Sequence, residues 1–264
     1  MADEASPLSN ASPPRDIRIS WTDLLIVFVL GGVGGGILTV MAGFAALLIA
    51  MRLGYQPTDP QALIAGLKLN FAANHIALVL SDLGFLIAMW FVSRRRFASP
   101  LAAYFPPIGL PTLALALLSG LVLSLVINGG NELLAYASLV QFHDTDVERA
   151  IQPHSALQYV AAFAVIALFA PFAEEFFFRG LMFRWLRQMR GPAFAIAVSA
   201  VVFGVIHGQM FLHPDVQGWL FTIELMGAGV VLALWAQGTG SLRASFATHA
   251  AYNAVAILFS ALFP

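Results

Sequence analysis

The chain has 264 residues, of which 59% are hydrophobic and only 10% are charged, with a net charge of -1 and a mean hydropathy of +0.83. Soluble domains carry about 25% charged residues, so a soluble fold of this composition would lack the polar surface to cover itself. The near-neutral charge gives no basic excess for nucleic acid, and the absence of cysteine excludes a disulfide framework and a thiolate metal site.

The first 20 residues are rich in serine and proline and have no apolar periodicity. This composition is typical of a disordered segment, so we expect residues 1–20 to be a disordered cytoplasmic tail rather than a targeting segment. We expect residues 21–264 to form a single transmembrane domain.

Charge-poor apolar runs of about 20 residues, the length that crosses a bilayer core of about 30 Å, follow one another along the chain. They predict an all-α fold, a multi-pass transmembrane helix bundle of about seven to eight helices. The seven predicted spans are Leu24 to Met51, Phe71 to Val92, Leu110 to Ile127, Ala156 to Phe183, Ala193 to Phe211, Gly218 to Gln237 and Ser241 to Leu262. Asn131 to Phe142 is also largely apolar and is the candidate for an eighth helix. The glycines of Gly31 to Gly36 predict close contact with another helix, because missing side chains let backbones approach.

The positions of lysine and arginine predict the orientation, because positively charged loops stay in the cytoplasm. With seven helices, nine basic residues fall on one side: Arg15, Arg18, Arg94, Arg95, Arg96, Arg184, Arg187, Arg190 and Arg243. Three fall on the other, Arg52, Lys68 and Arg149, and Arg179 lies inside a span. We therefore expect the N-terminus to be cytoplasmic and the loop from Gly129 to Ser155 to lie on the far side.

Ionisable residues inside spans are the first candidates for function, because each costs about 2.5–3.5 kcal/mol at a helix centre. The densest group is Glu174, Glu175 and Arg179. Glu175 and Arg179 are i and i+4 neighbours that can pair, whereas Glu174 is rotated away from them. A carboxylate outside an ion pair in a low-dielectric site is a candidate general base. A polar patch that holds helices together is the alternative, and these three residues support both interpretations about equally.

Two later helices carry histidines at matching spacings. Phe203 and His207 are i and i+4, so the phenyl ring can shield the imidazole from lipid. His249 and Asn253 have the same spacing, which places a ring N–H beside an amide N–H₂, and two adjacent donors can hold one developing oxyanion. A satisfied helix contact is the alternative for a single histidine, but two histidines after a glutamate pair favour a site.

Three further polar residues lie in spans, Asp82, Glu224 and Gln237. They could line a cavity, but we expect helix–helix hydrogen bonding as the role of each.

The ordered motifs Glu-Glu-x-x-x-Arg, Phe-x-x-x-His and His-x-x-x-Asn, over Pro171 to Val255, resemble the CAAX prenyl protease and bacteriocin-processing (CPBP) family of intramembrane proteases. The resemblance implies a protease-like core at about residues 156–262 and a CAAX-protease-like endopeptidase, a hydrolase acting near the C-terminus of, or within, a membrane-associated peptide. It implies that Glu174 and His207 activate a water and that His249 and Asn253 stabilise the oxyanion. Glu175 and Arg179, together with Phe203, would support the site or contact the substrate.

The substrate does not follow from the resemblance, because eukaryotic members cleave a prenylated CAAX tail whereas many prokaryotic members have no such partner. The expected partners are a membrane-associated peptide or protein and the lipid bilayer, with no nucleic acid, and the oligomeric state stays open. We expect a multi-pass protein of the bacterial cytoplasmic (inner) membrane.

Two functions of other classes fit the same polar cluster. In a proton-coupled transporter, Glu174, Glu175 and the histidines would relay protons. In a non-catalytic binding or immunity protein, the cluster would serve recognition only.

No cofactor is favoured, and zinc is the alternative. Glu174, His207 and His249 could supply its three ligands. We favour the metal-free mechanism, because ligation of zinc by Glu174 would remove the best-placed base.

Overall fold

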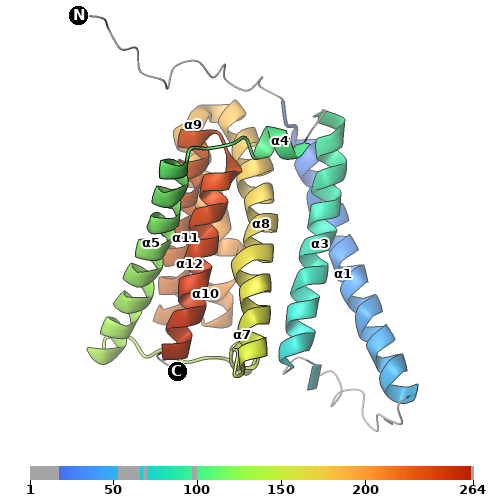
Figure 1. Ribbon diagram of the computed structural model, residues 1–264, viewed down its shortest axis with the longest axis vertical. Coiled ribbons are helices and arrows are strands. Elements are labelled where there is room, and N and C mark those ends of the chain that lie inside the picture. The colour runs from blue at the N-terminus through green and yellow to red at the C-terminus, as the bar shows by residue number, and fades with distance from the viewer. Residues whose placement is uncertain (1–17, 53–65, 68–69, 97–99, 263–264) are drawn as a thin grey trace, which may run out of the picture.

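The computed structural model describes residues 18–52, 66–67, 70–96 and 100–262. Within these ranges every element is helical, which confirms the predicted all-α bundle (Figure 1). The tail predicted over residues 1–20 lies, up to residue 17, outside the described residues.

The helices follow one another in the expected order. The long ones outside the central segment are α1 (Trp21–Arg52), α3 (Phe71–Arg96), α5 (Leu110–Tyr136), α11 (Val216–Thr239) and α12 (Leu242–Leu262). The central segment consists of α7 (Ala156–Ala162), the π-helix η1 (Phe163–Phe169), α8 (Ala170–Glu175), the π-helix η2 (Phe176–Met182) and α9 (Phe183–Ile206). The short helices are α4 (Pro100–Tyr104), α6 (Asp146–Ile151) and α10 (Gln209–Leu212).

Six helical stretches in the described part of the chain are long and apolar enough to cross a membrane. One of them, Ala156–Leu212, has 57 residues. At 1.5 Å per residue a straight helix of that length would extend about 85 Å, nearly three times a bilayer core of about 30 Å. This stretch must therefore bend back on itself.

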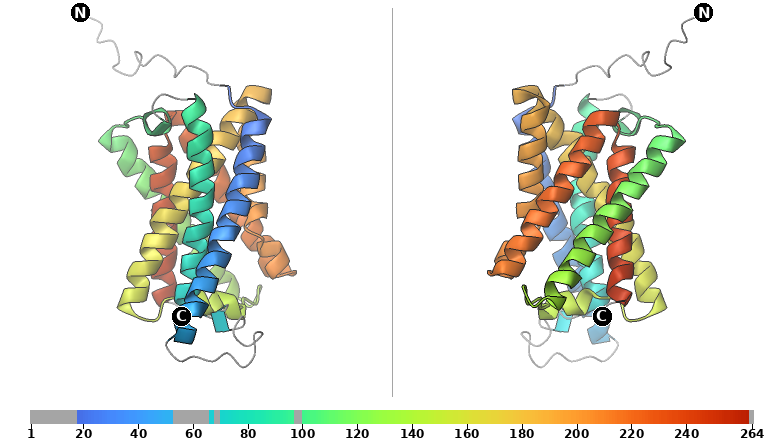
Figure 2. Two further views of the ribbon diagram at one scale, coloured as in Figure 1. Left: turned by 90° about the vertical axis from the view of Figure 1, so that its right-hand side faces the viewer. Right: turned by 90° about the vertical axis from the view of Figure 1, so that its left-hand side faces the viewer.

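The reversal lies at Arg190 and Gly191. Arg190 has φ -140° and Gly191 has φ +81°, a value that glycine adopts without the steric cost of a side chain. Pro192 follows, at the start of a new helical run where a missing N–H costs nothing. Figures 1 and 2 show the chain rising through α8 and returning through the later part of α9. The stretch thus makes two passes, and the seven predicted spans are all present.

The eighth helix predicted over Asn131 to Phe142 does not form. Residues Asn131 to Tyr136 are instead the last turns of α5, which ends nine residues beyond the predicted Ile127. Asn131 Nδ2 donates to Glu224 Oε2 on α11 over 3.3 Å, a contact that holds these turns in place. The chain then turns, with Ser138 at φ +55°.

The glycine-rich run of α1 packs against α3 as predicted. A Cβ atom added to Gly31 would lie 2.6 Å from Phe85 Cδ1, and one added to Gly35 would lie 2.7 Å from the Ser81 carbonyl oxygen. No larger side chain fits at either position without moving α3. The close contact fixes the face of α3 that carries Asp82.

The segment from α7 to η2 lies in the middle of the bundle, between α3 on one side and α12 on the other (Figure 1). Its apolar side chains belong to two buried clusters, one around Phe176 and Leu181 and one around Phe178 and Met182. Packing on both sides holds this segment rigidly, and it carries both glutamates of the predicted site.

Candidate active site

Glu175 and Arg179 form the predicted ion pair in the interior of the bundle. Arg179 Nη1 lies 2.8 Å from Glu175 Oε1, and both side chains are fully buried. Arg179 Nη2 also donates to the carbonyl oxygen of Gly229 on α11, over 3.1 Å. The pair therefore ties the glutamate-bearing helix to α11 while neutralising a buried carboxylate.

The π-helix η1 precedes the glutamates and leaves one backbone carbonyl oxygen without a backbone donor. The Ala170 N–H bonds to the carbonyl oxygen of Val165, five residues earlier. In the same register, the carbonyl oxygen of Ile166 would accept from residue 171, which is a proline without an N–H. Asn253 Nδ2 donates to this oxygen instead, over 2.8 Å. A side chain of α12 thus completes the hydrogen bonds of the helix that positions Glu174.

His207 stands at the C-terminal end of α9, with its ring fixed by the backbone. Its Nδ1 lies 2.6 Å from the carbonyl oxygen of Phe203, and Gly208 follows with φ +71°, where the helix stops. Since a carbonyl oxygen only accepts, Nδ1 carries the hydrogen and Nε2 of the neutral ring is an acceptor. This Nε2 lies 3.7 Å from Glu174 Oε2.

His249 on α12 is oriented in the same way by a carboxylate. Its Nδ1 lies 3.1 Å from Glu175 Oε1, which accepts the ring N–H. Its Nε2 lies 3.8 Å from Glu174 Oε2. The ring is almost fully buried, with 5% exposure. Glu175 thus serves both Arg179 and His249, and the ion pair is part of the site.

Glu174 Oε2 is the atom on which these side chains converge. It is buried and has no hydrogen-bond partner among the described residues. Both histidine Nε2 atoms lie within 3.8 Å, too far for a direct hydrogen bond and at a spacing that a shared water can bridge. A water placed there could donate its two hydrogens to Glu174 and His207 and remain within reach of His249. The arrangement can polarise a water molecule and accept a proton from it.

Phe203 forms one wall of this group. Its side chain is 1% exposed, and its ring centroid lies 4.6 Å from that of His207 and 5.7 Å from that of His249. The Arg179 Cζ lies 4.5 Å from the same centroid, in cation–π contact. Phe203 therefore packs against both imidazoles and the guanidinium, and its role in supporting the site stays a prediction.

Asn253 has a different environment from the one its spacing predicts. The hydrogen bond of its Nδ2 goes to Ile166 rather than to a shared point beside His249. Because an amide nitrogen carries two hydrogens, one N–H remains for a further acceptor. The joint donor role of His249 and Asn253 stays a prediction.

A cavity of about 320 Å³ opens at Glu174 and His207, and Asp82 of α3 lines it as well. Its other walls are largely aromatic and apolar, with Phe28, Phe85, Phe177, Phe178 and Ile206 among them. The Asp82 Oδ2 atom is buried without a hydrogen-bond partner in the described part of the chain. Helix–helix hydrogen bonding, the role expected for Asp82 from the sequence, does not describe this environment. The only sequence signal was a carboxylate within an apolar span.

Glu224 and Gln237 have the helix contacts expected of them. Glu224 accepts from Asn131 on α5, and Gln237 Oε1 lies 3.5 Å from Arg187 Nη1 on α9. Neither lines the cavity at Glu174.

The described residues contain no group of three histidine, aspartate or glutamate side chains arranged to hold a metal ion. Tetrahedral zinc with bonds of about 2.0–2.1 Å would bring its ligand atoms to about 3.4 Å from one another. The Glu174 to His207 and Glu174 to His249 distances of 3.7 and 3.8 Å exceed this. These side chains would have to move closer to become zinc ligands.

Comparison with known proteins identifies one family. Residues 156–255 match the model described as Rce1-like, type II CAAX prenyl endopeptidase Rce1-like. The matched residues span α7 to most of α12 and include every residue of the predicted site, which supports the family indicated by the motifs. No curated protein and no solved structure matches the chain.

Proposed function

We propose that this chain, whose residues 156–255 match the type II CAAX prenyl endopeptidase Rce1-like family model, is an intramembrane endopeptidase that hydrolyses a peptide bond with a water activated by Glu174 and His207. One observation carries the proposal. The Nε2 atoms of His207 and His249 both face Glu174 Oε2, at 3.7 and 3.8 Å, inside the bundle. No other buried carboxylate in the described residues has two histidines at this distance.

The first chemical step is attack by water on the scissile carbonyl carbon. Glu174 accepts one proton from the water, and His207 Nε2 accepts a hydrogen bond from the other hydrogen, which orients the oxygen lone pair. The new C–O bond forms while the carbonyl π electrons move to the oxygen. The proton held by Glu174 then passes to the amide nitrogen as the C–N bond breaks, so the site is restored.

His249 and Asn253 are assigned to the oxyanion. When the His249 ring carries both hydrogens, Glu175 accepts the one on Nδ1 and Nε2–H becomes a donor. The remaining N–H of Asn253 supplies the second donor. Loss of one such donor lowers kcat by about 10²–10³ in other hydrolases.

The substrate class proposed is a membrane-associated peptide. The cavity lies among membrane-spanning helices and its walls are mainly aromatic and apolar. Transfer of an apolar peptide segment from the lipid into the cavity therefore costs little free energy. Arg94, Arg95 and Arg96 at the end of α3 belong to the predicted cytoplasmic side, and we propose that the site acts on peptides of the cytoplasmic membrane.

The proposal is tested by Glu174→Gln, with Glu224→Gln as the matched control. Both changes replace an intramembrane carboxylate by an amide of the same shape, but only Glu174 lines the cavity. Cells carrying wild type or either variant at equal expression are compared by mass spectrometry of their membrane peptides. We expect uncleaved peptides to accumulate with Glu174→Gln and not with Glu224→Gln. Identical fragments from Glu174→Gln and wild type would refute the role of the base.

The metal-free form of the mechanism is tested on purified active protein. Zinc content, by elemental analysis, and peptidase activity are measured before and after treatment with a chelator. We expect the activity not to follow the zinc content. Loss of activity with zinc removal, and its recovery on zinc addition, would make Glu174, His207 and His249 ligands instead.

A further inference from the structure

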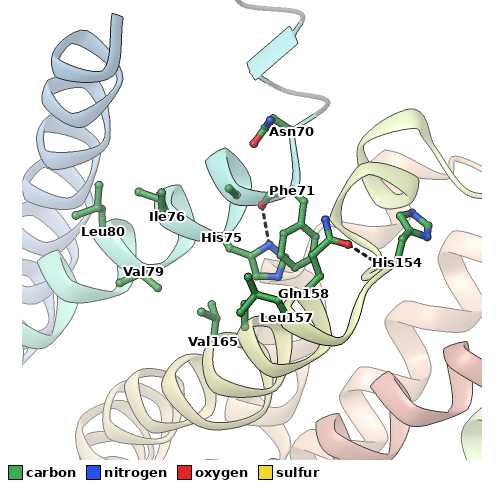
Figure 3. Close-up of a pocket in the computed structure, with 12 residues that line it drawn as sticks. Asn70, Phe71, His75, Ile76, Val79, Leu80, His154, Leu157, Gln158 and Val165 are labelled. Carbon is green, nitrogen blue, oxygen red and sulfur yellow. Dashed lines mark hydrogen bonds between the residues drawn. The ribbon is translucent and has the colours of Figure 1, made fainter. Parts of the chain in front are cut away.

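A second cavity, of about 760 Å³, lies between the first turns of α3 and the segment formed by α7 and η1. It shares no lining residue with the cavity at Glu174. Figure 3 shows the side chains of α3 and of the α7 to η1 segment facing one another across it. The cavity volume is within the range of about 300–1,000 Å³ that small-molecule sites occupy.

The side chain of His75 gives this cavity a defined polar point. It is 6% exposed, and its ring stacks on Phe71 with the centroids 3.9 Å apart. Its Nδ1 lies 2.9 Å from the carbonyl oxygen of Phe71, as the dashed line in Figure 3 marks. Because that oxygen only accepts, Nδ1 carries the hydrogen and Nε2 of the neutral ring is an acceptor. The Nε2 atom is buried and has no hydrogen-bond partner among the described residues. It can therefore accept a hydrogen bond from a ligand.

Two side-chain amides at the same end of the cavity are hydrogen-bond donors, whereas His75 Nε2 is an acceptor. Asn70 Oδ1 accepts from the backbone N–H of Ala73 over 3.0 Å, and Gln158 Oε1 accepts from the backbone N–H of His154 over 2.7 Å. With their oxygens engaged, both amides present N–H₂ groups to a ligand. This end of the cavity therefore combines one acceptor with two neutral donor groups.

The deeper walls are apolar. Val79 and Leu80 of α3 line them together with Ala161 and Val165 of the other segment. At 1.5 Å per residue, Leu80 lies about 14 Å along α3 from Phe71, whereas His75 lies about 6 Å along it. The polar groups thus lie near the membrane surface and the apolar walls lie at acyl-chain depth.

We propose that this cavity binds one phospholipid with a primary ammonium headgroup, of the phosphatidylethanolamine type, from the membrane leaflet at the start of α3. The ammonium donates to His75 Nε2, the phosphate oxygens accept from the amides of Asn70 and Gln158, and an acyl chain lies against Val79 and Val165. Among the described residues, no arginine or lysine lines the cavity, and this fits a zwitterionic rather than an anionic lipid. This lipid site does not depend on the proposed peptidase activity.

The test compares two lipids that differ only in the ammonium group. The full-length protein in detergent is mixed with equal amounts of phosphatidylethanolamine and phosphatidylcholine of identical chains, and retained lipid is measured by native mass spectrometry. Phosphatidylcholine has no N–H, so it cannot donate to His75. We expect wild type to retain the ethanolamine lipid about fivefold or more over the choline lipid, the order expected of one hydrogen bond from a charged donor. Equal retention would overturn the proposal.

Two variants test whether the preference for the ethanolamine lipid arises at this cavity. In His75→Phe, which keeps an aromatic ring beside Phe71, the retention ratio should fall to about one. In Ala161→Leu, which fills the apolar wall, both lipids should be retained less while their ratio is unchanged. An unchanged preference in folded His75→Phe would assign the lipid to another surface. The wild-type comparison remains decisive if either variant fails to fold.

Discussion

Removal of the Arg179 side chain is the most direct perturbation of the buried ion pair. In Arg179→Met a side chain of similar length replaces the guanidinium, and Glu175 Oε1 loses its partner at 2.8 Å. Glu175 is fully buried, so water cannot replace the lost contact, and His249 Nδ1 at 3.1 Å remains as its neighbour. Breaking a buried pair by removing one partner costs about 3–5 kcal/mol. The remaining histidine contact favours the lower end of this range.

The expected effect is measurable as a loss of thermal stability in detergent. For a chain of this size, about 3–5 kcal/mol corresponds to a fall in Tm of roughly 6–20 °C. The control is the double variant Glu175→Gln with Arg179→Met, in which the amide oxygen still accepts from His249 while the uncompensated charge is gone. We expect the double variant to recover more than half of the loss.

Two results would refute this reasoning. A Tm of Arg179→Met within about 2 °C of wild type would mean that the carboxylate is not buried as a charge. A double variant as unstable as Arg179→Met would mean that the Gly229 and Phe203 contacts of Arg179, rather than its charge, carry the stability.

Two further predictions concern the ends of the bundle. Burial acts to raise the pKa of Glu148, but the Thr145 backbone N–H and His213 outweigh it and lower that pKa below its usual value. A lowered carboxyl pKa contributes stability above the ordinary value of about 4.3, which is lost as the pH falls through the lower folded-state pKa. Below about pH 4 the Tm of the wild type should therefore fall, and the Tm of Glu148→Gln should fall less. Equal dependence of the two Tm values on pH would contradict this. For the orientation, an exposed cysteine in Arg94→Cys should resist an impermeant reagent added outside, whereas one in Gln141→Cys should react, and the reverse pattern would invert the topology.

The helical architecture could be predicted because apolar length determines it. Seven spans followed from composition, and the ion pair of Glu175 with Arg179 followed from its i, i+4 spacing. The eighth helix was wrong because the Asn131 contact with Glu224 belongs to tertiary structure and extends α5 past the expected end. Such a contact leaves no periodicity in the sequence.

The sequence could not predict which side chains from different helices point toward one another. Glu174 lies 16 positions before Arg190 and His207 lies 16 positions after Gly191, so the reversal between these residues brings the two side chains to one level, 3.7 Å apart. Asp82 could not be assigned to the cavity, because its neighbour Glu174 lies 92 positions away along the chain. Both features depend on how the helices pack.

Asn253 allows structural and catalytic roles to be separated in one experiment. In Asn253→Ala the carbonyl oxygen of Ile166 loses its donor, since Pro171 cannot supply one, and an unsatisfied polar group of this kind costs about 1–3 kcal/mol. Pro171→Ala restores a backbone N–H at the position from which the π-helix register would bond Ile166. The double variant Asn253→Ala with Pro171→Ala should therefore regain most of the stability that Asn253→Ala loses.

The activity of the same double variant tests the oxyanion assignment. If Asn253 also donates to the oxyanion, the kcat of the double variant should stay about 10²–10³-fold lower than that of Pro171→Ala although the fold is restored. The reason is that no backbone N–H replaces the oxyanion donor. The measurement is the turnover of a cleaved membrane peptide by each variant at matched folded concentration, with Pro171→Ala alone as the reference. Recovery of both stability and turnover would limit Asn253 to completing the hydrogen bonds of the π-helix, and His249 would then remain as the oxyanion donor.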